Sequence, residues 1–366
     1  MAALKDLYSI AFYETFAKAL KLELPEFDET LFFEKIFDSS WDILELKGRM
    51  RHTAIVLHSF FSGDVLSDLK SIKRLVPQLQ KLGVKNSNLE YMFLPDYIEL
   101  YAQEHIESAF NTFEEITSFT SCEFAIRPFI LKHPDFAIPK MFEWCSHSNE
   151  HVRRLASEGC RPRLPWAMAL PQLKQNPEPI IPIIEHLLFD ESEYVRRSVA
   201  NNLNDISKDH PKLVLQFAQK WMGNNGNTDR LIKHACRTLL KSSFPGIMDQ
   251  FGLGLRENNI NVTMQLAQRQ VANEGDLFFE MRLENTSMEV LKLRLEYAMY
   301  FLRQNGTWSK KVFKISEREA QKQESIVINK KHSFRYITTR KYYKGVHFLS
   351  VIVNGIEFHK SEFELI

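Results

Sequence analysis

The chain has 366 residues, enough for two domains and a large buried core. Hydrophobic residues make up 44% and charged residues 25%, which is typical of a globular protein and excludes a disordered chain. The net charge is only +1, so binding of a nucleic acid would require a local basic patch. We find no run of roughly 18 to 20 apolar residues, and residues 1–20 are amphipathic and charged, so we expect no membrane contact and no secretory signal.

Residues 1–105 predict several helices. Apolar residues recur at helical spacing from Leu4 to Ala11, from Phe32 to Phe37, and from Ile72 to Leu82, where Gly83 should end the helix. The many phenylalanines are most simply explained as core, and the segment has more acidic than basic residues. We expect no functional site in it.

From about residue 106 the sequence repeats. Similar helices begin at Val152, Val195 and Ile232, with another expected around Glu123 and further helices between them. Two helices in roughly 40 residues is the period of HEAT-type repeats, which stack into a solenoid whose concave surface is lined by one helix of each repeat.

After Gly252 and Gly254 the pattern changes to short alternating strands, with Asn305-Gly306 and Asn354-Gly355 as hairpin turns. We therefore predict a mostly α protein: a HEAT-like repeat α-solenoid over residues 1–256 and an immunoglobulin-like β-sandwich domain over 257–366. Within the β-domain, residues 308–344 hold 11 basic and 3 acidic residues, a local charge of +8.

Four cysteines are present, and none lies in a CxxC pair or at the spacing of a zinc site. We expect reduced, buried thiols in a cytoplasmic protein, and neither a metal nor a cofactor. The cysteines are Cys122, Cys145, Cys160 and Cys236.

Successive repeats place cations at corresponding positions, opposite their packing stripe. An ordinary solvated face with ion pairs between neighbouring turns is the simpler interpretation of any one helix. Three such helices in a row instead favour a basic groove, because the planar guanidinium suits phosphate. The candidate DNA-binding residues of the groove are Arg127, Arg153, Arg154, Arg161, Arg163, Arg196, Arg197, Asn201, Lys208, His234 and Arg237. The β-domain adds Lys310, Lys311 and Lys341.

Three carboxylates in the groove, Glu123, Glu158 and Asp205, point to catalysis, since each would repel phosphate in a passive binder. Cleavage of an N-glycosidic bond passes through an oxocarbenium-like transition state that carboxylates can stabilise while orienting water. Trp166 could offer its flat face to a cationic sugar or base. Alternatively, Trp166 packs between repeats.

The helical part closely resembles the AlkC-type DNA alkylation-repair glycosylases, which share HEAT-like repeats. Long matching segments lie at 121–130, 151–171, 192–211 and 232–240, and weaker ones at 45–52 and 93–101. The β-domain agrees in kind with the immunoglobulin-like domain that many members carry.

The resemblance implies a monofunctional bacterial DNA-3-methyladenine glycosylase in the cytoplasm at the nucleoid, acting as a monomer on double-stranded DNA with alkylated bases. It implies excision of 3-methyladenine, and of 3-methylcytosine and 1-methyladenine, from bent DNA without full base flipping. By the same resemblance, Glu123, Glu158 and Asp205 are catalytic, Trp166 is the active-site wall, and Arg154 and Arg161 contact the DNA.

Two other interpretations remain open. One is a non-catalytic HEAT-repeat scaffold that binds protein or DNA. The other is an AlkD-like enzyme that takes bulky adducts.

Overall fold

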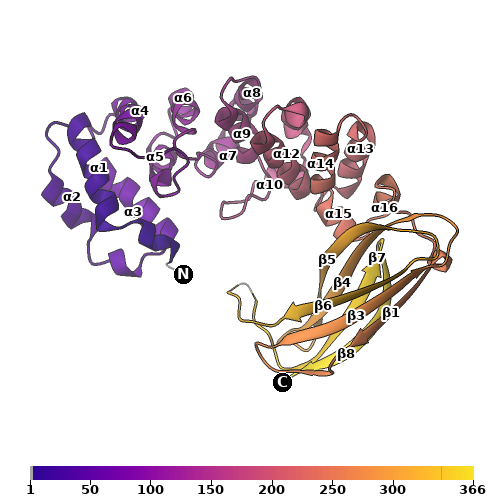
Figure 1. Cartoon of the computed structure of the whole chain (residues 1–366). Coiled ribbons are helices and arrows are strands. Elements are labelled where there is room, and N and C mark those ends of the chain that lie inside the picture. Colours follow the sequence, from indigo (N-terminus) through magenta and orange to yellow (C-terminus); the bar gives the residue numbers. More distant parts are fainter. Residues whose placement is uncertain (1–2, 339) are drawn as a thin grey trace. The chain divides into compact units, whose positions relative to one another are not determined.

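The structure is a computed structural model that describes residues 3–338 and 340–366 (Figure 1). It contains two compact units. The first consists of Met1–His210 and Met222–Ala235, and the second of Pro211–Trp221 and Cys236–Ile366. The second unit thus groups three helices with the strands, which begin at Ile260. The predicted division between residues 256 and 257 stays a prediction.

In its described residues, the first unit consists of helices joined by turns and loops, without a strand. Its helices are α1 Ile10–Glu23, α2 Glu29–Ile36, α3 Leu46–His58, α4 Val65–Lys81, α5 Phe93–Tyr101, α6 Ile106–Ile116, α7 Arg127–Lys132, α8 Pro134–Trp144, α9 Glu150–Gly159, α10 Pro171–Gln175, α11 Ile181–His186, α12 Glu193–Ile206 and α14 Gly226–Ala235.

The sequence encodes several helix ends locally. The Asp28 carboxylate accepts from the Leu31 N–H at 3.0 Å at the start of α2, and Asn149 accepts from the His151 N–H at 2.9 Å at the start of α9. Helix α4 ends where predicted, with Gly83 at φ +88° just beyond it. The expected stripe from Leu4 to Ala11 is wrong in its first part. Residues Leu4–Leu7 form an exposed 3₁₀ turn without a buried residue, and α1 starts later, at Ile10.

The predicted repeat helices α9 and α12 pack against each other. The apolar side chains of α9, among them Val152, Leu155 and Ala156, are buried as expected. A side chain at Gly159 would place its Cβ atom 2.8 Å from Cγ2 of Ile126, so only glycine allows this close approach to the preceding repeat.

Two predicted helices differ from the observed ones. Glu123 lies in a turn, and α7 begins four residues later at Arg127. Pro128 explains this, because proline lacks the N–H that a longer helix would need and fits only its first turn. The third repeat helix is interrupted at Cys236, so that His234 lies on α14 and Arg237 on α15 (Arg237–Lys241).

The second unit holds the β-sandwich, and its expected strands are confirmed. One sheet has the order β1-β3-β6 and the other β2-β8-β7-β4-β5. The strands are β1 Ile260–Leu266, β2 Gln270–Val271, β3 Asp276–Asn285, β4 Leu291–Leu302, β5 Trp308–Ala320, β6 Ser325–Ser333, β7 Gly345–Val353 and β8 Ile356–Leu365. Its other helices are α13 Pro211–Trp221 and α16 Ile247–Gln250.

Both predicted hairpin turns are present. Gly306 at φ +76° connects β4 to β5, and Asn354 and Gly355, both with positive φ, connect β7 to β8. Alternate residues of the strands face the core between the sheets, including Met281, Leu295 and Val351. In the part of the chain that the structure describes, no helix is long and apolar enough to span a bilayer.

Candidate active site

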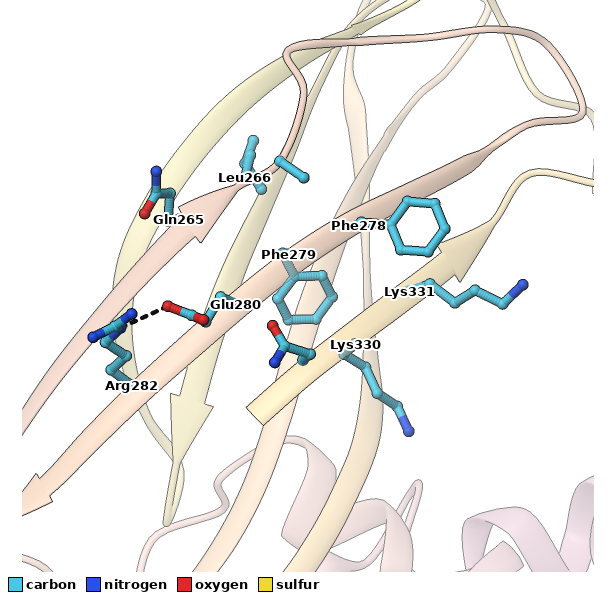
Figure 2. A pocket seen from close by; sticks show the side chains of 10 residues that line it. Gln265, Leu266, Phe278, Phe279, Glu280, Arg282, Lys330 and Lys331 are labelled. Carbon is cyan, nitrogen blue, oxygen red and sulfur yellow. Dashed lines mark hydrogen bonds and ion pairs between the residues drawn. The ribbon is translucent and has the colours of Figure 1, made fainter. Parts of the chain in front are cut away.

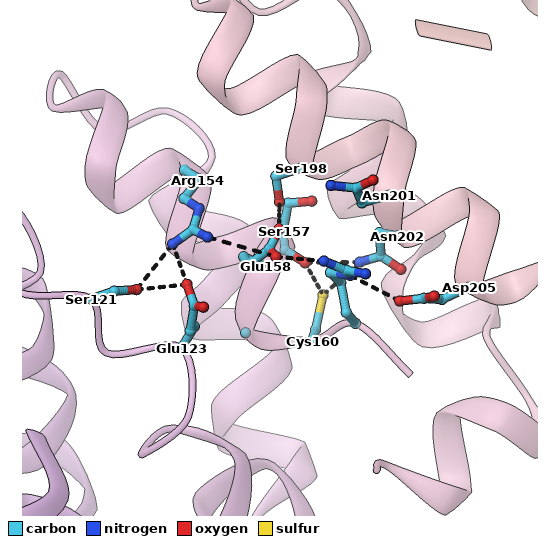
Figure 3. A network of polar contacts seen from close by, with 12 residues as sticks. Ser121, Glu123, Arg154, Ser157, Glu158, Cys160, Ser198, Asn201, Asn202 and Asp205 are labelled. Carbon is cyan, nitrogen blue, oxygen red and sulfur yellow. Dashed lines mark hydrogen bonds and ion pairs between the residues drawn. The ribbon is translucent and has the colours of Figure 1, made fainter. Parts of the chain in front are cut away.

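The three candidate carboxylates come together although they lie on separate elements (Figure 3). Glu123 belongs to the turn before α7, Glu158 to the last turn of α9, and Asp205 to α12. Two arginines connect them: Arg154 on α9 and Arg161 in the loop after it. We call these five residues the carboxylate-arginine network.

Arg154 joins the first two carboxylates. It forms an ion pair with Glu123, and its Nη2 atom lies 3.6 Å from Oε1 of Glu158. Ser121 accepts from Arg154 at 3.0 Å and donates to Oε2 of Glu123 at 2.7 Å. The Tyr194 ring of α12 lies 5.1 Å from the guanidinium, a cation–π contact. Arg154 is thereby fixed between two repeats.

Arg161 joins the second pair of carboxylates. Its Nη1 atom donates to Glu158 at 2.6 Å and its Nε atom to Oδ2 of Asp205 at 2.9 Å. Glu158 also accepts from the Ser198 hydroxyl at 2.6 Å, and Asp205 from Lys208 at 2.9 Å. Both oxygens of Glu158 and of Asp205 are therefore paired.

Burial differs among the carboxylates. The side chains of Glu158 and Asp205 are 7% and 2% exposed, whereas that of Glu123 is 15% exposed. The described hydrogen bonds and ion pairs of Glu123 all involve Oε2, and Oε1 takes part in none of them. Burial alone would lower the pKa of both Arg154 and Arg161, but the neighbouring carboxylates more than offset it and raise each pKa. The arginines thus remain charged.

Trp166 lies on the loop between α9 and α10, five residues after Arg161 of this network. Its side chain is 60% exposed, so the alternative that it packs between repeats is wrong. Its backbone is left-handed, at φ +65°, which is rare for a bulky residue and costs about 1–3 kcal/mol. Such strain persists only where surrounding contacts impose it, and it is frequent in functional loops.

Two basic residues hold the Trp166 loop. Arg127 is fully buried and donates to the Met168 carbonyl at 2.7 Å and to the Gly159 carbonyl at 2.9 Å. Burial lowers its pKa to about 10. Lys47 of α3 donates to the carbonyl of Trp166. Sequence reasoning placed Arg127 among the DNA-binding residues, but its complete burial favours a structural role.

Three other predicted DNA-binding arginines are engaged in contacts within the helical unit. Arg153 is buried and forms a bidentate ion pair with Asp190, at 2.7 and 3.1 Å. Arg163 forms a similar pair with Asp209, at 3.0 and 2.7 Å, and is partly exposed. Arg196 donates to the Asp190 carbonyl at 2.6 Å. The contacts of Arg153 and Arg163 connect successive repeats, whereas that of Arg196 is local. A DNA contact by Arg153 would require breaking its pair with Asp190.

The remaining predicted groove residues are accessible to a partner. Arg197, Lys208 and His234 are exposed, and His234 Nε2 lies 3.0 Å from Oδ1 of Asn201. In the second unit, Arg237 is partly buried.

The predicted basic residues of the β-domain lie on its surface. Lys310 is paired with Glu357 at 2.6 Å, while Lys311 and Lys341 are exposed. Burial, and then the positive charges of Arg340 and Lys241, lower the pKa of Lys311. A hollow of about 830 Å³ follows β1, β3 and β6, with Lys330 and Lys331 at its border (Figure 2).

Sequence reasoning missed several residues of the site. Ser121, Tyr194 and Ser198 orient the network, and Lys47 and Arg51 come from the segment in which no site was expected. The weaker family-like segments at 45–52 and 93–101 were the available signal. All four cysteines are buried, and the residues described include no group of His, Cys, Asp and Glu that could hold a metal.

Comparisons with known proteins find relatives of both parts of the chain. A family model described as DNA alkylation repair enzyme matches residues 95–239. A second, described as the C-terminal Ig-like domain of the uncharacterised protein YhaZ, matches residues 261–366. The uncharacterized protein YhaZ of Bacillus subtilis (strain 168) is 38% identical over 355 residues, which cover 97% of each chain.

One solved structure is similar over the full length. It is the alkylpurine DNA glycosylase AlkC of Pseudomonas fluorescens bound to DNA containing an abasic site analog. The two proteins are 32% identical, each is covered to 100%, and the TM-score is 0.93. The chain therefore belongs to the AlkC-type family of DNA alkylation-repair glycosylases, with HEAT-like repeats and a C-terminal immunoglobulin-like domain.

Proposed function

We propose that this DNA glycosylase hydrolyses the N-glycosidic bond of small cationic alkylated bases in duplex DNA. Its main substrate is 3-methyladenine, with 3-methylcytosine and 1-methyladenine as further substrates. The observation that carries the proposal is the cluster of Glu123, Glu158 and Asp205, joined by Arg154 and Arg161. Trp166, on the loop that follows Arg161, is exposed. A passive DNA-binding surface gains nothing from carboxylates at its centre, because they repel phosphate.

The chemistry follows from the charge of the substrate. A base that alkylation has made cationic leaves without a proton, so the reaction needs no strong general acid. Positive charge then develops on the sugar, where a carboxylate stabilises it and orients the attacking water. Glu123 is the best placed for the water, because it is the most exposed of the three and its Oε1 atom takes part in none of the described contacts.

Asp205 and Glu158 act from deeper positions. Glu158 holds both arginines in place. Asp205 is covered by Lys208, whose own side chain is 40% exposed. A DNA phosphate that attracts Lys208 would uncover Oδ1 of Asp205 and let it face the sugar cation.

DNA is held around the lesion by Arg154 and Arg161, with Arg197, Asn201, Lys208 and His234 farther along the repeats. Trp166 presents its ring to the cationic base or sugar. The lesion is exposed by bending of the duplex, without full extrusion into a pocket. The β-domain contributes further contacts to the DNA phosphates through Lys310, Lys311 and Lys341. The enzyme works as a monomer at the bacterial nucleoid.

The test is to incubate the full chain with N-methylated duplex DNA and identify the released bases by chromatography and mass spectrometry. The proposal predicts free 3-methyladenine and an abasic site without strand cleavage. DNA binding without base release would instead indicate a scaffold. Preferential release of large N3 or N7 adducts would indicate AlkD-like selectivity.

A further inference from the structure

A hollow of about 260 Å³ lies in the first unit, next to the carboxylate-arginine network. Its walls come from α3, α5, the turn that carries Glu123 and the loop that carries Trp166. None of the three carboxylates of the network, Glu123, Glu158 and Asp205, lines this hollow.

The hollow shares a wall with the active site. Ser121 lines it and also donates to Glu123 at 2.7 Å. Phe124 and Ala167, which directly follow Glu123 and Trp166 in the chain, line it as well.

The lining combines apolar surface with a few polar groups, as ligand pockets do. Met50, Met92 and Phe124 offer flat or adaptable apolar contacts. Arg51 donates from Nη2 to Oε1 of Glu99 at 2.7 Å, and its side chain is 38% exposed. The Oε2 atom of Glu99 makes none of the described hydrogen bonds, so it is available to accept one.

Asp96, in the same wall, is a buried carboxyl group with one oxygen that lacks a hydrogen-bond partner. Oδ1 pairs with Arg51 at 2.9 Å, while Oδ2 is buried without a hydrogen-bond partner. Burial raises the pKa of this carboxyl to about 7, against the opposing effect of Arg51. Strongly shifted acids in hollows are more frequent at functional sites than elsewhere.

The size of the hollow limits its occupant. Pockets for drug-sized ligands measure about 300–1,000 Å³, so 260 Å³ suits a single nucleobase rather than a nucleotide. A purine with an exocyclic amine has the matching chemistry. Its amine would donate to Glu99, a ring nitrogen would accept from Arg51, and the flat ring would lie against Met92 and Phe124.

We propose that this hollow binds the free purine base after its release from DNA. The inference rests on the proposed function, which supplies the free base. Held there, the leaving base is kept away from the sugar cation while water attacks. No residue of the catalytic network is needed for the binding itself.

The experiment measures binding of free 3-methyladenine to the full chain, without DNA, by saturation-transfer NMR and calorimetry. Ala167→Phe fills the hollow and should abolish binding. Glu99→Gln removes the charged acceptor and should weaken binding about tenfold. Glu143→Gln, on the exposed face of α8, is the matched control and should bind like the native protein.

The binding experiment and the base-release experiment test the two proposals separately. The proposal is overturned if the native protein does not bind the base. It is also overturned if the Ala167→Phe and Glu99→Gln variants both bind the base as tightly as the native protein. Base release from methylated DNA is measured separately, and its absence contradicts the proposed function whatever the hollow binds. If Ala167→Phe does not fold, Glu99→Gln against its control decides the question.

Discussion

The Nε atom of Arg161 lies 2.9 Å from Oδ2 of Asp205, although the residues are 44 positions apart and belong to successive repeats. On its other side, Arg161 contacts Glu158 at 2.6 Å. One guanidinium therefore holds two buried carboxylates at a fixed separation. The same contact that shapes the candidate active site also fastens one repeat to the next.

Removing this cation should destabilise the protein. Arg161→Met leaves Glu158 and Asp205 buried with one fewer compensating charge, and breaking a buried ion pair costs about 3–5 kcal/mol. Chemical denaturation of the variant should show a loss of this order. Arg197→Met, at an exposed position of α12, is the control and should change stability by less than about 0.5 kcal/mol. Equal stability of both variants would mean that the network does not hold the repeats together.

Trp166 should matter for excision and not for stability. Its ring is exposed and its φ is +65°, a conformation that glycine adopts without strain. Trp166→Gly should therefore unfold at or above the native temperature. Its single-turnover excision should fall about tenfold, since a cation–π contact contributes about 0.5–2 kcal/mol. Trp166→Phe, which keeps an aromatic face, should lose less, and equal excision by both variants would exclude a role for the ring.

Asp96 should make the free energy of unfolding depend on pH. Burial raises its pKa to about 7 in the folded protein, compared with about 3.9 in an unfolded chain. The folded state binds this proton more tightly, so the associated stability is full below about pH 4 and is lost as the pH rises through 7.

Asp96→Asn removes that titration. Denaturation at pH 5 and pH 8 should show the variant gaining stability relative to the native protein at the higher pH. Asp135→Asn, at an exposed position of α8, should show no such change. A constant difference between Asp96→Asn and the native protein would contradict the raised pKa.

The β-domain cations should contribute to DNA affinity through phosphate. In the double variant Lys311→Ala and Lys341→Ala, the slope of log K against log salt should become shallower by about 0.9 per lost contact. Fluorescence anisotropy with duplex DNA over a salt series gives this slope. Lys81→Ala, at the end of α4, controls for a general change in charge. An unchanged slope would show that Lys311 and Lys341 do not contact DNA phosphates.

Much of the fold could be predicted from the sequence, because its signals are local. The period of Val152 and Val195 gave the repeats, and Asn354-Gly355 gave a hairpin turn that the structure contains. Helix α7 begins later than predicted because Pro128 fits only in the first turn of a helix, so the helix cannot begin near Glu123. The grouping of α13, α15 and α16 with the strands depends on tertiary contacts, which no local pattern reports.

The three carboxylates of the candidate site could be predicted from the sequence, but the residues that contact them could not. Glu123, Glu158 and Asp205 stood out as carboxylates among cations, and the structure brings them together. Arg127 is buried and bonded to the loop that carries Trp166. Helical spacing could not predict this, because it does not distinguish a buried arginine from an exposed one. The hollow lined by Ser121 also has walls from α3 and α5, which are distant in sequence, so no local pattern predicts it.

The most direct test of the central claim is the single-turnover release of 3-methyladenine by Glu123→Gln, Glu158→Gln and Asp205→Asn, with DNA affinity measured in parallel. Each variant removes one negative charge and nearly preserves shape. The account predicts that all three still bind DNA and that at least one releases the base about 100-fold more slowly than the native enzyme. Near-native release by all three would contradict the assignment of this carboxylate cluster as the catalytic centre.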